Sequence, residues 1–82
     1  MSSIEWRSIA YEKHYSETLT GLEAKRNSDP SYKIENSKGV LKHLYIQEGN
    51  DQGGRGEVQD ICLAAQIAAY ESFIAGWEKI LP

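Results

Sequence analysis

The sequence has one cysteine, two prolines and no long apolar run. Cys62 alone supports neither an intrachain disulfide nor a cysteine zinc cluster. A bilayer span needs ~20 apolar residues, and the N-terminus lacks the basic segment and apolar core of a secretory signal. These absences predict a cytoplasmic chain in a reducing compartment, without a membrane segment.

Positive charge is also scarce. Nine basic residues stand against twelve acidic ones, which gives a formal net charge of -3 over 82 residues. A chain of this charge lacks the broad positive face that grips phosphate backbones, so we do not expect nucleic acid as the partner. The length allows a single domain over 1–82, and a domain this small buries too little surface to be very stable alone.

Three segments carry helical periodicity, and none alternates as a strand does. The predicted fold is all-α, with helices over about 3–26, 32–47 and 57–81 in an antiparallel helical hairpin or bundle. Asp29-Pro30 suits a helix start, with the second helix beginning between Pro30 and Ile34. Gly49 suits its end, and the glycine-rich stretch 49–56 is a connector.

The first predicted helix has one apolar stripe, formed by Ile4, Tyr11, Tyr15, Leu19 and Leu22. The third, long helix has two apolar surfaces. One is formed by Leu63, Ile67, Tyr70, Ile74, Trp77 and Leu81, and the other by Val58, Ile61, Cys62, Ala65, Ala69, Phe73 and Ile80, with the small residues Ala68, Ser72 and Gly76 beside it. The two shorter helices offer one main stripe each, so apolar surface is left over.

This surplus predicts a homodimer or higher oligomer whose small residues let two backbones approach closely. The predicted interface consists of Trp6, Ile9, Ile61, Ala65, Ala69, Phe73, Gly76 and Ile80. Two alternatives stay open. The first two helices can flank the third from two sides within a monomer, or a different protein can bind the third helix.

One stretch of the sequence has a pattern seen at binding sites. Gly53, Gly54, Arg55 and Gly56 precede a helix, which is typical of anion sites, but the lysine of a phosphate loop is missing. His14 and His43 lie on different helices, and a calcium loop that starts at Glu48 would have Gln59 where it requires a glutamate. We expect no catalytic residue, metal or cofactor. The predicted function is a non-enzymatic, self-associating structural or adaptor module; the alternatives are a regulator that binds an anionic ligand at 53–56 and a DNA-binding regulator, which Glu57 and Asp60 disfavour.

Overall fold

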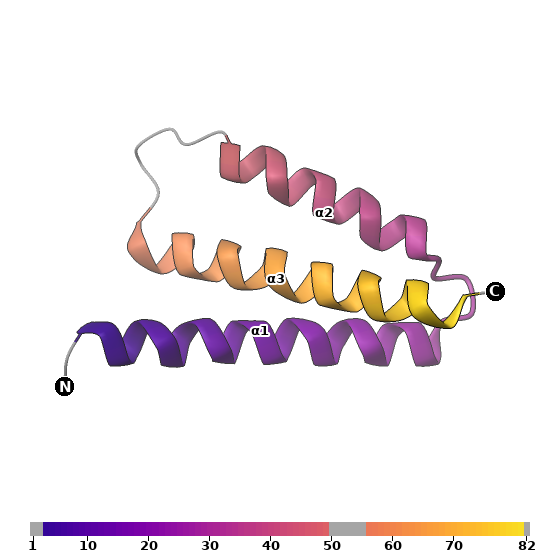
Figure 1. Ribbon diagram of the computed structural model, residues 1–82, viewed down its shortest axis with the longest axis horizontal. Helices are drawn as coiled ribbons and strands as arrows, with labels where there is room; N and C mark the ends of the chain where they lie inside the picture. The colour runs from indigo at the N-terminus through magenta and orange to yellow at the C-terminus, as the bar shows by residue number, and fades with distance from the viewer. Residues whose placement is uncertain (1–2, 50–55, 82) are drawn as a thin grey trace.

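Three helices make up the fold, shown in Figure 1. The structure is a computed structural model and describes residues 3–49 and 56–81. Helix α1 spans Ser3–Ser28, α2 spans Ile34–Gly49 and α3 spans Glu57–Ile80, and the described part of the chain contains no strand. Consecutive helices run antiparallel, so α1 and α3 are parallel to each other (Figure 1). The all-α, three-helix prediction is confirmed, with helix ends within three residues of those expected.

Helix α3 is the centre of the molecule. Both α1 and α2 pack against it, but they do not pack against each other. In Figure 1, α2 lies along one side of α3 and α1 along the other. Two different helices of the same chain thus cover the middle of the two apolar surfaces predicted for the third helix, as in the monomeric alternative to a dimeric bundle. Val58, Ile80 and Leu81, at the ends of these surfaces, stay exposed.

The α2 side of α3 carries the main hydrophobic cluster. Leu44 of α2 packs with Leu63 and Ile67 of α3, and Leu41 and Tyr70 cover the cluster at its edge. Exposed polar contacts flank this cluster: the Tyr45 hydroxyl donates a hydrogen bond to Glu71, and Lys38 Nζ lies 3.2 Å from Glu78 Oε2. Burial in this cluster therefore holds α2 in place, and the surface polar contacts add little.

The α1 side of α3 is built on small residues. A row spaced by four residues runs along α3 and consists of Ile61, Ala65, Ala69, Phe73 and Trp77. One end of the row shares a hollow with the start of α1, and at the other end Arg26 of α1 lies over the rings of Phe73 and Trp77. Ala65 and Ala69, between these ends, are 0% exposed. Because alanine carries a single methyl group, the backbone of α1 can come close to α3 along this row.

This packing changes the role of three residues that the sequence analysis assigned to a contact between chains. Ala65, Ala69 and Phe73 are buried within one chain, beneath α1. The small residues do permit two helix backbones to approach closely, as predicted, but the helix that approaches is α1 of the same molecule. A partner chain cannot reach these three side chains while α1 stays in place.

The turn between α1 and α2 differs from the prediction. Asp29 does not cap α2; its Oδ1 accepts hydrogen bonds from the Ser31 backbone N at 3.0 Å and the Ser31 Oγ at 2.6 Å. These bonds stabilise the carboxylate and lower the pKa of Asp29 below its ordinary value. The start of α2 is capped instead by Asn36, whose Oδ1 accepts a 2.8 Å bond from the Lys33 backbone N, one residue before Ile34. Asp29 therefore shapes the turn, and Asn36 fixes the first turn of the helix.

One polar pair is enclosed where this turn meets the helices. The Ser37 side chain is fully buried, and its Oγ lies 2.6 Å from the hydroxyl oxygen of Tyr32. Tyr32 also packs on Trp77 with ring centroids 6.0 Å apart. The tyrosine thus joins the turn to both α2 and α3 while it satisfies the buried serine.

We predict that Ala69→Glu unfolds the single chain, because the new carboxylate would lie under α1 with neither room nor a partner. The free energy of unfolding should fall by about 3–5 kcal/mol. Urea unfolding followed by circular dichroism measures the change. Ala75→Glu, on the exposed part of the same helix, is the matched control and should change stability by less than ~0.5 kcal/mol. Equal stability of the two variants would contradict the placement of α1.

A second prediction concerns the buried serine. Tyr32→Phe leaves the Ser37 hydroxyl without its partner and should lower the free energy of unfolding by about 1–3 kcal/mol. Adding Ser37→Ala to this variant removes the orphaned group and should restore most of the loss. A double variant as unstable as the sum of both single variants would mean that the two hydroxyls do not interact.

Candidate functional site

The predicted interface residues do not form one surface in the structure. Ile9, Gly76 and Ile80 are exposed, Trp6 and Ile61 are half-buried, and the remaining three are covered by α1. Because α1 and α3 are parallel, Ile9 near the start of α1 and Ile80 at the end of α3 lie near opposite ends of the molecule. These two residues cannot share a single patch on one chain.

The predicted anion site lies mostly outside the described residues, since Gly53, Gly54 and Arg55 belong to the stretch between α2 and α3. Gly56 is described, and it is the residue before α3. Its backbone is extended, with φ -76° and ψ 164°, a conformation open to any residue. Its carbonyl oxygen accepts a 3.0 Å hydrogen bond from the backbone N of Asp60 in the first turn of α3. Anion binding at 53–56 remains a prediction from sequence.

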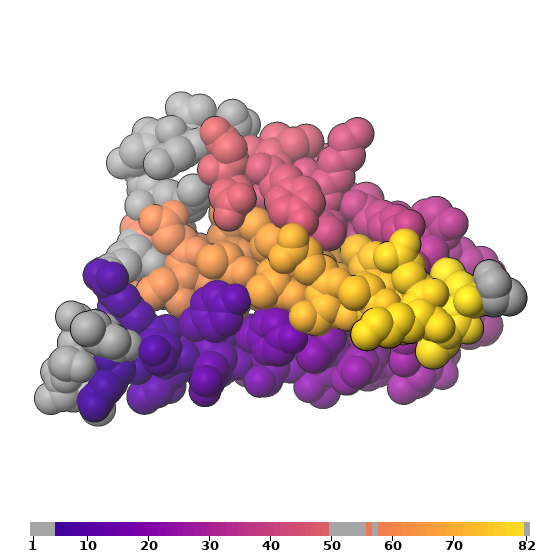
Figure 2. All heavy atoms as spheres, in the orientation of Figure 1, coloured from indigo at the N-terminus to yellow at the C-terminus, as the bar shows by residue number. Residues whose placement is uncertain are grey.

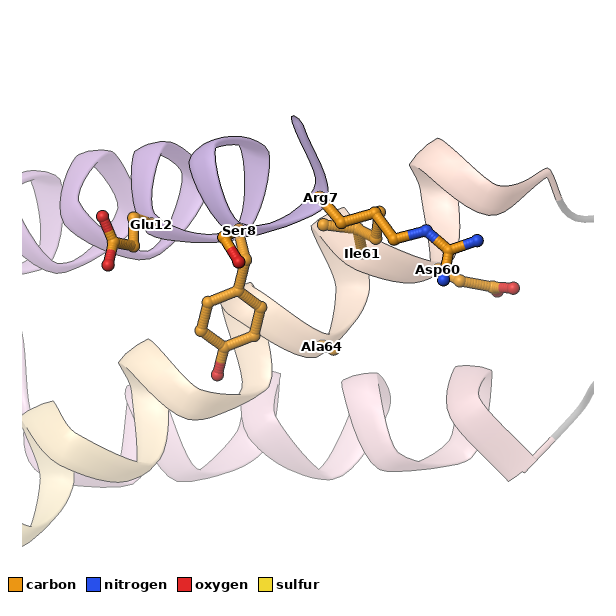
Figure 3. Close-up of a pocket in the computed structure, with 7 residues that line it drawn as sticks. Arg7, Ser8, Glu12, Asp60, Ile61 and Ala64 are labelled. Carbon is orange, nitrogen blue, oxygen red and sulfur yellow. The ribbon is translucent and has the colours of Figure 1, made fainter. Parts of the chain in front are cut away.

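A groove opens where α1 and α3 begin side by side. The hollow has a volume of about 410 Å³. Figure 3 shows residues that line it. Ile61 and Ala64 contribute its apolar wall from α3, and the Arg7 side chain extends along the groove toward Asp60 (Figure 3). Glu12 lies at the end away from Arg7, with Ser8 between them. The groove therefore has an apolar wall and a carboxylate at one end.

A second hollow of about 310 Å³ continues along α1 and is lined by Tyr11, Glu12, Tyr15 and Ser16. Tyr11 and Glu12 line both hollows. The rings of Tyr11 and Tyr15 are nearly parallel, with centroids 6.4 Å apart and an interplanar angle of 10°. The Tyr15 hydroxyl donates a 2.9 Å hydrogen bond to Ser72 Oγ on α3, which holds this ring in place.

The opposite end of the same helix pair is filled by aromatic rings and cations. The guanidinium of Arg26 lies 5.4 Å from the ring centroid of Phe73 and 5.6 Å from that of Trp77. The Lys25 ammonium lies 5.1 Å from the centroid of Tyr32. Each cation on a ring contributes about 0.5–1 kcal/mol at such exposed positions. Arg26 and Trp77 also line a hollow of about 440 Å³, together with residues of the turn between α1 and α2. In the space-filling view of Figure 2, the yellow end of α3 lies directly against α1 there.

Groups with catalytic or metal-binding chemistry are dispersed. His14 lies on α1, the exposed His43 on α2 and the half-buried Cys62 on α3. Among the described residues, no group of three or more histidine, cysteine, aspartate or glutamate side chains is placed to hold a metal ion. None of the described helices combines the length and the hydropathy that a membrane span requires.

The groove was not predicted from the sequence. Tyr11 and Tyr15 were expected in the core stripe of the first helix, but Tyr11 is exposed and Tyr15 is half-buried beside Glu12. The sequence did contain a signal. Two positions of the stripe are tyrosines, whereas Leu22, further along the same stripe, is purely apolar. A tyrosine carries a polar hydroxyl, so it suits the edge of an interface better than its centre.

Comparison with known proteins adds no assignment. Neither the protein-family models, nor the curated proteins, nor the solved structures contain a match to this chain.

The contact between α2 and α3 changes the pKa of one tyrosine. The hydrogen bond that Tyr45 donates to Glu71 raises the pKa of Tyr45, because loss of its proton would set two negative charges side by side. A raised pKa in the folded chain means that this contribution to stability is present below pH 10 and is lost as the pH rises further.

We predict that Glu71→Gln moves the pKa of Tyr45 down toward 10, since the neutral amide accepts a hydrogen bond without repelling the phenolate. Nuclear magnetic resonance of ring-labelled tyrosines follows the titration of each residue. Glu78→Gln serves as the control, because Glu78 pairs with Lys38 and should leave the Tyr45 titration unchanged. A Tyr45 titration that is identical in wild type and Glu71→Gln would show that the two side chains do not meet.

Proposed function

We propose that this protein is a cytoplasmic, non-enzymatic helical module that self-associates and serves as an assembly or adaptor unit. The supporting observation is that α1 and α2 each cover one side of α3 and do not pack on each other. Among the described residues, eight large apolar side chains are exposed and seven are buried. Such a chain gains stability when a second copy covers the remaining apolar surface.

The size of this gain can be estimated from three side chains. Ile80 is 69% exposed, Ile9 60% and Val58 56%. Full burial of a side chain of this size contributes ~1.5–3 kcal/mol relative to full exposure. The free energy gained by burying several of these side chains is comparable with a substantial part of the free energy of unfolding of a whole small domain. Ile9, Gly76 and Ile80 are the members of the sequence-predicted interface that remain accessible to another chain.

The distribution of reactive groups supports a non-enzymatic role. An acid, base or nucleophile needs a partner within hydrogen-bond reach and a site that excludes water. The two histidines and the cysteine lie on three different helices, and the carboxylates with resolved partners lie on exposed edges. The single cysteine and the charge of -3 support the proposal of a cytoplasmic protein partner.

We predict that sedimentation equilibrium from about 10 to 500 µM shows a species heavier than 9.2 kDa, and that the melting temperature rises with concentration. Ile9→Asp, Val58→Asp and Ile80→Asp test the three exposed side chains one at a time. At least one should lower the mass while the helix content stays intact. Thr20→Asp, at an exposed polar position of α1, is the control. A monomer at every concentration would refute self-association.

A further inference from the structure

Glu12 lies between two hollows on the surface of α1. On one side is the groove with the apolar wall of Ile61 and Ala64, and on the other is the hollow formed with Tyr15 and Ser16. Tyr11 lines both. Along the first four turns of α1, a carboxylate and two aromatic rings thus lie next to an apolar hollow. The described side chains leave this part of the surface of α1 open.

The charges of the groove are unequal at its two ends. Arg7 extends toward Asp60 and away from Glu12 (Figure 3), so the positive charge of Arg7 lies at the end of the groove opposite Glu12. Glu12 forms no ion pair with any residue that the structure describes. A group that complements the charge of Glu12 at this end of the groove is therefore a cation.

The stacked tyrosines narrow the choice of cation. Tyr11 is exposed, and Tyr15 is held by its hydrogen bond to Ser72. The two nearly parallel rings line the same hollow as the Glu12 carboxylate. A guanidinium group suits this site because it is planar, stacks on aromatic rings and binds a carboxylate with two parallel hydrogen bonds. A lysine ammonium can do only part of this, because it is a compact and strongly hydrated charge.

At its other end, the same helix pair already has a guanidinium stacked on aromatic rings. There Arg26 of α1 lies over Phe73 and Trp77 of α3, with both ring centroids within 5.6 Å of its guanidinium carbon. At the groove the rings and the carboxylate are present, but the described part of the chain supplies no guanidinium over the rings of Tyr11 and Tyr15.

We propose that the groove is a docking site for a segment of another protein that presents an arginine beside an apolar side chain. The arginine binds the Glu12 carboxylate and stacks on Tyr11 and Tyr15. An apolar side chain about one helical turn away enters the hollow between Ile61 and Ala64. This interaction is separate from self-association, because it uses none of the exposed side chains Ile9, Val58 and Ile80.

The probe is an alanine-based helical peptide that carries leucine and arginine four residues apart. Its matched partner has citrulline, which keeps the shape of arginine and removes the charge. Both are titrated into the isotope-labelled full chain, and amide resonances are followed. We expect shifts over residues 7–16 and 60–64, and an affinity for the arginine peptide about tenfold above that for the citrulline peptide.

Three variants of the chain define the contact. Glu12→Gln should abolish the preference for arginine over citrulline, whereas Glu17→Gln, at another exposed acid of α1, should keep it. Ala64→Leu fills the hollow from an exposed position and should weaken both peptides alike. Circular dichroism of each variant shows whether the helices are intact, so that a folding defect is recognised as such.

Several results would overturn the proposal. Equal affinity for the two peptides, or an arginine preference that survives in Glu12→Gln, removes the role of the carboxylate. Absence of any shift over 7–16 and 60–64 at about 1 mM peptide removes the groove as a docking site. Shifts in the groove that appear on raising the protein concentration without peptide would assign it to a second copy of this chain instead.

Discussion

The contact between α1 and α3 across Ala65 and Ala69 is the constraint on which the rest of the molecule depends. Both alanines are fully enclosed, and they stand in the middle of a row that α1 follows from one end of α3 to the other. Two helix backbones approach this closely only where side chains are small. With α1 in that position, the opposite side of α3 is left to α2, and the chain returns along the molecule through the Asp29 to Lys33 turn.

Because both outer helices pack only on α3, the hydrophobic core is small. Each outer helix buries one stripe against α3, and the outer helices do not bury surface against each other. Leu44, Leu63 and Ile67 form a compact cluster on the α2 side, but side chains such as Ile9 and Ile80 have no described neighbour to cover them fully. A chain of 82 residues has little surplus core to compensate, which is the physical basis for expecting association.

The two ends of the parallel α1–α3 pair differ in a way that matters for binding. At the C-terminal ends, the guanidinium of Arg26 lies over the rings of Phe73 and Trp77. At the N-terminal ends, Tyr11, Glu12 and Ile61 border an open groove. The chain therefore stabilises one end by its own cation and aromatic contacts, and it leaves the other end with the chemistry of a recognition surface.

Much of this fold could be predicted from the residues in order. Helical spacing of apolar side chains, turn residues near 27–31 and the glycines of 49–56 were enough for the number, class and approximate bounds of the helices, because these features act locally along the chain. The two apolar surfaces of α3 and the close approach that its alanines permit were also evident.

A helical wheel records which sides of a helix are apolar, however, and carries no information about what covers them. That Ala65 and Ala69 lie under α1, that Asn36 rather than Asp29 caps α2, and that Tyr11 and Tyr15 border a groove at Glu12 depend on contacts between residues far apart along the chain or on the exact path of a turn. Only the packed arrangement of the three helices decides those contacts, because each one requires the others to be in place.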